Sequence, residues 1–346
     1  MVASSSPVRP TIEAPSQSVA LHQERLPVPT APPTRLRRAG SSRNATWGLP
    51  RAFINYTAVA DTGIGGKATK WVLINRARPV DFYIAKFGNK NGTIEVLTEL
   101  FNNQLGTALG FEMAHSGLAR LDEHLYFVTR NFREENENTV HGSLMIEQVF
   151  AAPKATEQID TKHEQSFYSV DVMRDVIYEF CRADADRVFQ KFIEMLIFDA
   201  LIGAMDRHAQ NWGVLQTSTT PNICRFAPIF DTARALFWDI PDGRLAGYEQ
   251  TETRLLKYIE NSRPCIGPHA NHPKNNDCNH FDLVVNLMHL WPHQTSQALR
   301  KIPNDADLRA ARMLRTFPFH SAFSDLRKLL ITKTLRIRAS RLREGG

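Results

Sequence analysis

Three polar residues in the middle of the chain have the types and the order that phosphoryl transfer from ATP requires. Asp206 lies five residues before Asn211, both follow a long apolar stretch, and a second acid, Asp231, comes further along. One carboxylate can accept the proton of an acceptor hydroxyl, while an amide oxygen and a second carboxylate can hold Mg²⁺ against the phosphates. An isolated Asp/Asn pair is usually structural, so the prediction depends on further motifs.

A lysine and a glutamate upstream form a second candidate pair. Lys86 stands within an apolar run over residues 82–87, where a buried ammonium needs a partner. The helix predicted over residues 93–109 offers Glu99, with Glu95 one turn earlier as the alternative. A strand lysine paired with a helix glutamate positions ATP phosphates in kinases. The alternative is a lysine that faces solvent from an edge strand.

Two backbone segments are further candidates for nucleotide binding. Gly63, Gly65 and Gly66 precede the first predicted strands and could form a loop whose N–H groups approach phosphates, although such glycines are also ordinary in turns. The segment that includes Arg130, Asn131 and Phe132 lies where the β-rich pattern gives way to a helical one. We predict a hinge there, whose backbone receives the adenine.

The periodicity predicts an α+β, bilobal, protein-kinase-like fold. Strands are expected over 70–75, 80–87, 112–120 and 124–131, with the helix over 93–109 between them. Helical patterns then dominate, over 170–183, 185–204, 281–291, 304–315 and 319–343. We therefore divide the chain into a disordered basic arm rich in Pro and Ser (1–46), a small β-rich lobe (47–132) and a largely helical lobe (133–346).

Together these motifs resemble the HipA-like serine/threonine kinases, whose distant relatives are the phosphoinositide kinases. The resemblance is carried by residues 199–213, which contain a DRHxxN element, and by residues 227–237 with a PIFD element. Supporting matches are residues 84–86, Glu99 followed by 109–110, and residues 140–143. The DFG motif of the protein kinases is missing.

The resemblance implies a role for each matched position. Asp206 would be the catalytic carboxylate, and Asn211 and Asp231 would be ligands of Mg²⁺. Lys86 would bind the phosphates of ATP, with Glu99 as its ion-pair partner. Arg207 and His208 belong to the same motif and would brace the catalytic loop or contact phosphate.

The resemblance also implies an activity and partners. It implies transfer of the γ-phosphoryl of ATP to Ser or Thr of a protein substrate, autophosphorylation included, in a toxin or effector setting. An antitoxin-like regulator is a further expectation, which is weakened because a Pro-rich arm stands where the toxin branch carries a folded N-terminal subdomain. Two alternatives stay open: a lipid or small-molecule hydroxyl as acceptor, and a nucleotide-binding pseudokinase that acts as an interaction module.

Charge and composition limit the partners. Of the net charge of +6, the first 50 residues carry +4 and residues 320–346 carry +5, which leaves −3 on residues 51–319. A nucleic acid is therefore disfavoured as substrate, because an enzyme acting on one usually has a basic folded body. The chain shows no transmembrane run and no secretory signal peptide, and its four scattered cysteines suit a reducing compartment. We expect a cytoplasmic protein, with a secreted effector as the alternative.

Two further features admit a plain and a functional interpretation. The basic residues of the predicted C-terminal helix are interpreted as a solvated face. The loop over 262–280 collects Cys265, His269, His272, Cys278 and His280, which favours a surface loop, with a zinc site as the alternative.

Overall fold

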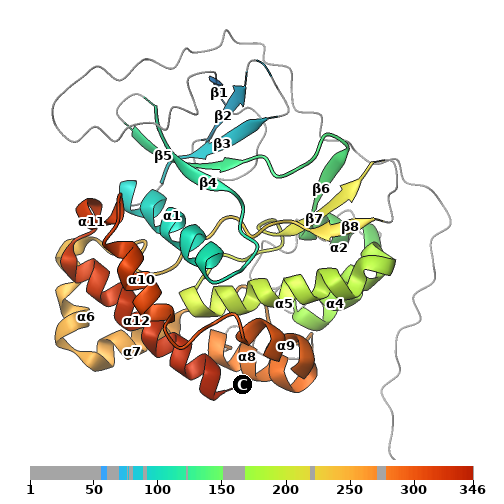
Figure 1. Cartoon of the computed structure of the whole chain (residues 1–346). Helices are drawn as coiled ribbons and strands as arrows, with labels where there is room; N and C mark the ends of the chain where they lie inside the picture. The colour runs from blue at the N-terminus through green and yellow to red at the C-terminus, as the bar shows by residue number, and fades with distance from the viewer. Residues whose placement is uncertain are drawn as a thin grey trace, which may run out of the picture.

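The computed structural model has two lobes, a small β-sheet lobe above a larger helical one (Figure 1). It describes residues 56–60, 70–75, 77, 81–88, 92–121, 124–150, 168–218, 223–270 and 278–345. Gly63, Gly65, Gly66, His272 and the arm over 1–46 lie outside the described residues. The α+β, kinase-like fold expected from the sequence is confirmed.

The upper sheet places Lys86 near its centre. Its five antiparallel strands follow the order β1-β2-β3-β5-β4. They span Tyr56–Ala60 (β1), Lys70–Asn75 (β2), Phe82–Lys86 (β3), Ser116–Leu121 (β4) and His124–Arg130 (β5). Because β3 pairs with β2 on one side and β5 on the other, Lys86 ends a central strand, not the edge strand of the alternative interpretation.

Helix α1 (Thr93–Ala108) lies below this sheet and faces the larger lobe (Figure 1). Val96, Leu97, Leu100, Phe101 and Leu105 are buried and recur at the spacing of one helical face. Glu99 lies between these residues and is 4% exposed. The buried side chains of α1 thus fix the position of the helix that carries Glu99, the predicted partner of Lys86.

The larger lobe is built around helix α5 (Ala185–Ile202), which is buried throughout its second half. It packs against α4, α8, α9 and α12. Gly203 ends the helix in the left-handed region, with φ 70°. A Cβ at this position would lie 3.2 Å from Cζ of Arg338, so glycine suits both the backbone angle and the close approach.

A second, three-stranded sheet of order β6-β7-β8 lies between α5 and the upper lobe (Figure 1). Its strands span Glu137–His141, Gly213–Thr217 and Cys224–Phe226. Strand β7 begins just after Asn211, and β8 leads into the segment that carries Asp231. The sequence did not predict β6, because this polar edge strand lacks the apolar alternation of a half-buried strand.

The remaining helices surround α5. They span Gly142–Phe150 (α2), Val170–Cys181 (α4), Ala246–Gln250 (α6), Glu252–Asn261 (α7), His280–Leu290 (α8), Pro292–Leu299 (α9), Ala306–Leu314 (α10), Phe319–Ala322 (α11) and Asp325–Glu344 (α12). The helix predicted over 319–343 is therefore two helices. Ser324 has extended backbone, and its hydroxyl accepts a hydrogen bond from the Arg327 amide, which starts α12 anew.

The interpretation of α12 as a solvated basic face is wrong for two of its arginines. Arg327 and Arg338 are 0% and 1% exposed. Arg327 Nη1 donates to the Phe237 carbonyl oxygen at 2.8 Å, and its Nη2 pairs with Asp242 at 2.6 Å. Arg338 Nε donates to the carbonyl oxygen of Ala200 at 2.7 Å. These two side chains pack α12 against the segments before and after the candidate site.

Candidate active site

The loop from Gly203 to Trp212, which joins α5 to β7, is held from inside by Arg207. Its Nε and Nη2 lie 2.8 and 2.9 Å from the two carboxylate oxygens of Asp199 on α5. Its Nη1 donates at 2.6 Å to the carbonyl oxygens of both Asn211 and Phe230. All three nitrogens of a guanidinium that is 2% exposed are thereby engaged. Of the two roles considered for Arg207, this geometry fits bracing of the loop and not contact with phosphate.

The turn from Asp206 to Asn211 is closed by its own hydrogen bonds. Asn211 Nδ2 donates to the carbonyl oxygen of Asp206 at 2.7 Å, and the Asn211 amide donates to the His208 carbonyl oxygen at 2.9 Å. The Gln210 amide donates to Nδ1 of His208 at 3.3 Å, so this ring also contacts the turn. Because the amide nitrogen of Asn211 is engaged, its side-chain oxygen is the atom that could bind a cation.

Side chains from distant segments support the same loop from behind. The Tyr168 hydroxyl donates to the Arg207 carbonyl oxygen at 3.0 Å. Cys265 Sγ donates to the Met205 carbonyl oxygen at 3.1 Å, and His280 Nε2 lies 2.8 Å from the Ala204 carbonyl oxygen. Burial holds the pKa of His280 well below its usual value, so the ring is neutral.

Among the described residues, which leave out His272, these contacts do not favour the zinc alternative. No three side chains among the described residues are grouped so that they could hold a metal ion through His, Cys, Asp or Glu. Cys265 and His280, which the sequence suggested as ligands, instead contact the loop that carries Asp206.

Lys86, Glu99 and Asp231 meet where the two lobes adjoin. Lys86 Nζ lies 3.5 Å from a carboxylate oxygen of Glu99 and 3.2 Å from one of Asp231. The structure thus pairs Lys86 with Glu99, the carboxylate that the sequence favoured. It also brings in Asp231, a contact that the sequence did not predict.

Two backbone features hold Asp231 at this point. Its φ is 57°, in the left-handed region that Asp adopts more readily than most residues. The carbonyl oxygen of the next residue, Thr232, accepts a hydrogen bond of 2.7 Å from Nδ2 of Asn102. Asn102 lies one turn after Glu99 on α1, so one helix face holds both Lys86 and the Asp231 segment. The sequence did not predict a role for Asn102, although its spacing from Glu99 places both residues on the same face of the helix.

Electrostatics keep Lys86 charged and raise the pKa of Glu99. Burial alone would lower the pKa of Lys86, but Asp231 and Glu99 outweigh it and raise the pKa above its usual value. Burial raises the pKa of Glu99 to about 7, against the opposing effect of Lys86. With Glu99 ionised, two carboxylates share one ammonium, and the net negative charge favours binding of a further cation.

The residues present fit a magnesium ion. Mg²⁺ in kinase-type sites is bound by one or two carboxylates together with substrate phosphates, not by an all-protein cage. Asp231, whose side chain is 35% exposed, and Asn211 supply a carboxylate and an amide oxygen. Arg207 Nη1 bonds the carbonyl oxygens of Asn211 and of Phe230, so the two ligand-bearing segments adjoin.

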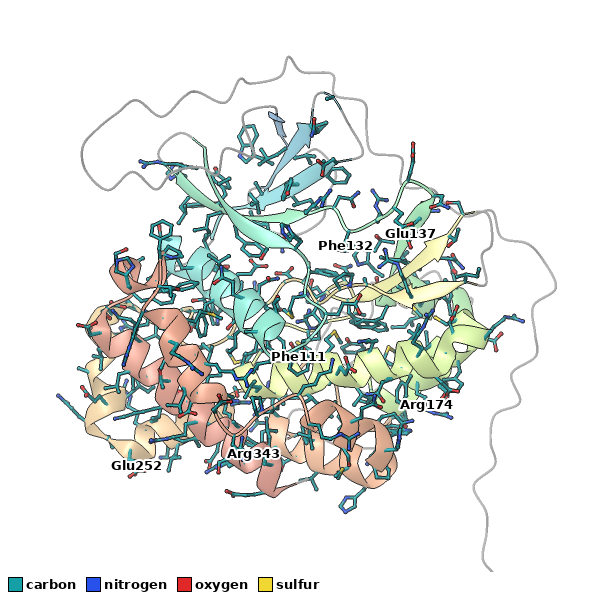
Figure 2. The ribbon with its side chains drawn as sticks, viewed as in Figure 1. Phe111, Phe132, Glu137, Arg174, Glu252 and Arg343 are labelled. Atoms are coloured by element: carbon teal, nitrogen blue, oxygen red, sulfur yellow. The ribbon has the colours of Figure 1, made fainter. Side chains whose placement is uncertain are left out.

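The predicted hinge joins the upper sheet to β6. Figure 2 shows Phe132 and Glu137 along this passage. The Asn131 amide already donates to the Phe82 carbonyl oxygen at 2.8 Å, and the Phe132 carbonyl oxygen accepts from Arg225 at 3.1 Å. Adenine would therefore have to use other backbone groups of this segment.

The side chains of the hinge have their own contacts. The Phe132 ring stacks on Phe230, next to Asp231, with the ring centroids 5.8 Å apart. Arg130 pairs with Asp81 at 3.0 Å, at the edge of the upper lobe. The contribution of Arg130, Asn131 and Phe132 to nucleotide binding stays a prediction.

One charged residue beside Asp206 was not among the predicted site residues. Arg234 Nη1 lies 3.0 Å from Oδ1 of Asp206. Arg234 was quoted only as part of the 227–237 motif, and nothing in its spacing marked it, because the contact depends on the turn that follows Asp231.

A sheet lobe above a helical lobe, with a lysine–glutamate pair on the first and an Asp/Asn loop on the second, defines a protein-kinase-like fold. A family model described as the HipA-like C-terminal domain matches residues 62–274. This is more than half of the chain, and the chain belongs to the HipA-like kinase family.

Two solved structures are similar to this chain. The Helicobacter pylori proinflammatory kinase CtkA superposes with a TM-score of 0.64 at 18% identity, over 80% of this chain and 92% of that chain. HipA of Shewanella oneidensis MR-1, in a toxin–antitoxin complex with HipB and its operator DNA, gives a TM-score of 0.49 at 11% identity, over 82% and 65%. No curated protein sequence matches the chain.

Proposed function

We propose that this protein is an ATP- and Mg²⁺-dependent kinase that phosphorylates Ser or Thr of a protein substrate, itself included. The observation that carries the proposal is the convergence of Lys86, Glu99 and Asp231 beside the loop of Asp206 and Asn211. Phosphoryl transfer needs all five groups. An interaction module that acts without catalysis does not require the complete set.

Each side chain has a defined task in this proposal. Lys86, oriented by Glu99, binds the phosphates of ATP, and Asp231 and Asn211 hold Mg²⁺, which neutralises charge on the phosphates when bound. Asp206 accepts the proton of the acceptor hydroxyl. The acceptor oxygen forms its bond to the γ-phosphorus as the bond to the β–γ bridging oxygen breaks, and the electron pair of that bond leaves with ADP.

Burial raises the pKa of Asp206 above its usual value, against the effects of Arg234 and His208. Such a shift brings the pKa of the carboxylate closer to the working pH, which favours proton transfer. Membership of the HipA-like family supports a protein acceptor in this proposal. No helix in the described part of the chain combines the length and the apolar composition needed to cross a bilayer.

The acceptor is tested by incubating the full chain with γ-labelled ATP and Mg²⁺, alone, with a mixture of proteins, and with phosphoinositide vesicles. Acid hydrolysis of labelled protein should release phosphoserine or phosphothreonine. If the label enters only the lipid, the acceptor is a lipid hydroxyl and not a protein. Binding of ATP without any transfer would favour the pseudokinase.

A regulator is the second part of the proposal. The Shewanella oneidensis HipA structure contains HipB. We infer that a separate protein regulates this kinase. Co-purification of the native protein with a stoichiometric partner that lowers its kinase activity would support the inference, and full activity of the protein at its native abundance without any partner would argue against it.

A further inference from the structure

Arg234 is an exposed charged residue that contacts the proposed catalytic machinery. Its side chain is 43% exposed, against 27% for Asp206, with which it pairs at 3.0 Å. Its guanidinium also lies over the ring of Trp238, with Cζ 5.5 Å from the ring centroid. The Met205 amide donates to the Arg234 carbonyl oxygen at 3.1 Å, so the backbone is fixed to the catalytic loop while the side chain reaches solvent.

A cation beside the transferred group stabilises the charge that develops during phosphoryl transfer. Charge spreads over the three equatorial oxygens of the transferred group, and an arginine that meets them can accelerate the reaction strongly. Among the described residues, two other cations near the site already have partners. Arg207 is 2% exposed, and its nitrogens are bonded to Asp199 on α5 and to the carbonyl oxygens of Asn211 and Phe230. Lys86, whose side chain is 17% exposed, lies between Glu99 and Asp231.

The position of Arg234 suits this task. The acceptor oxygen must come within hydrogen-bond distance of Asp206, roughly 2.6–3.2 Å, to give up its proton. The phosphoryl group is then bonded in part to that same oxygen. A guanidinium that already touches Asp206 is therefore one side-chain rotation or less from the phosphoryl oxygens, and its planar N–H fork matches them.

We propose that Arg234 is a catalytic residue that binds the phosphoryl group during transfer and rests on Asp206 when no phosphoryl group is present. The inference builds on the proposed kinase activity and adds a group that none of the sequence motifs assigned. It also separates two arginines of one site: Arg207 holds the loop, and Arg234 acts on the reacting group.

Two simpler roles for Arg234 make different predictions. A purely structural partner of Asp206 would support the loop equally with or without nucleotide. A recognition residue for acidic acceptors would change the KM for the acceptor and leave kcat unchanged. Only a residue that meets the phosphoryl group discriminates between ground state and transition state.

The test compares Arg234→Gln with wild type in the full chain. Binding of a non-hydrolysable ATP analogue with Mg²⁺ should stay within about two-fold, since the ground state is not the target of Arg234. Binding of ADP with aluminium fluoride and Mg²⁺, which imitates the planar phosphoryl group, should weaken at least about 10-fold, and kcat should fall about 100-fold or more. Added guanidinium ion should restore part of the activity of Arg234→Ala.

Arg174→Gln is the matched control. Arg174 also pairs with a carboxylate, Asp175 at 3.0 Å, and also lies over an aromatic ring, Tyr178 at 4.5 Å. It lies on α4, away from the upper sheet (Figure 2). This variant should match wild type in every measurement.

Three results would overturn the inference. An Arg234→Gln enzyme with unchanged kcat and a raised KM for the acceptor would make Arg234 a recognition residue. Equal weakening of the ATP analogue and of ADP–aluminium fluoride would make it a ground-state or structural residue. A wild-type protein that neither transfers phosphoryl nor binds the ATP analogue would overturn the proposed function, and this inference with it.

Discussion

Arg207 and Asp199 form a two-fold hydrogen-bonded ion pair, Nε to Oδ2 at 2.8 Å and Nη2 to Oδ1 at 2.9 Å, with both side chains at most 3% exposed. The pair joins the loop from Gly203 to Trp212 to α5, which is buried throughout its second half. Removal of one partner of a buried pair leaves an uncompensated charge, which costs more than the pair itself contributes.

The first prediction concerns this pair. Asp199→Asn should lower the free energy of unfolding by about 3–5 kcal/mol, because Arg207 stays buried without its carboxylate. Urea unfolding of wild type and variant at neutral pH measures the difference. Glu179→Gln is the control, since its pair with Arg182 is exposed on both sides and should contribute less than about 1 kcal/mol. Equal stabilities of Asp199→Asn and wild type would contradict the bracing role.

The second prediction concerns Lys86 and pH. Lys86→Met should abolish phosphoryl transfer and should destabilise the protein more at pH 8 than at pH 6. Burial already raises the pKa of Glu99 from 4.5 to about 7, and loss of the ammonium raises it further. The folded variant then binds more protons than the unfolded chain above pH 4.5, so its stability falls as the pH rises.

Urea unfolding at both pH values checks this prediction. Lys328→Met is the control, because Lys328 pairs with Asp325, a fully exposed carboxylate, and its effect should not change between the two pH values. A Lys86→Met effect that is the same at pH 6 and pH 8 would show that Glu99 does not carry the buried charge.

The third prediction separates the metal ligand from the proton acceptor. Asp231→Asn should weaken binding of an ATP analogue in the presence of Mg²⁺ and remove the Mg²⁺ dependence of that binding. Asp206→Asn should leave both nearly unchanged, because Asp206 acts on the acceptor hydroxyl. Calorimetric titration with and without Mg²⁺ gives both quantities. An Mg²⁺ dependence that persists in Asp231→Asn would remove Asp231 as the metal ligand.

The fourth prediction concerns the domain boundary. A chain that begins at residue 47 should keep its ATP turnover, since residues 1–46 contain seven prolines and too little apolar surface to form part of a lobe. Ser4, Ser5, Ser6, Ser41 and Ser42 are predicted sites of autophosphorylation in this arm. Loss of nucleotide binding on truncation would instead assign the arm to the small lobe.

The sequence indicated the candidate site residues better than it indicated the tertiary contacts that hold them in place. Lys86, Glu99, Asp206, Asn211 and Asp231 could be found because phosphoryl transfer needs these types in this order, and apolar strands and helices flank them. Contacts that depend on how distant segments fold together left no local pattern. The pairing of Arg234 with Asp206 and the hydrogen bond of His280 to the catalytic loop are of this kind.

Helix α12 shows the physical reason most clearly. Its buried positions recur every three or four residues, at Arg327, Leu330, Ile331, Thr334, Leu335, Arg338, Ala339 and Leu342. Two of these buried positions are arginines. Because arginine is charged, the sequence favours the interpretation of the basic residues of this helix as a solvated face. Only the tertiary structure supplies the carbonyl oxygens of Phe237 and Ala200 that make an arginine acceptable there.

Transfer of γ-labelled phosphate, measured for wild type and Asp206→Asn under the same conditions, tests the central claim most directly. Wild type should label itself or an added protein on Ser or Thr. Asp206→Asn should bind the ATP analogue as wild type does. Its rate of phosphoryl transfer should fall by at least about 100-fold, because only the proton acceptor is lost. Transfer by Asp206→Asn at the wild-type rate, or no transfer by a wild-type protein that binds ATP and Mg²⁺, would contradict the account.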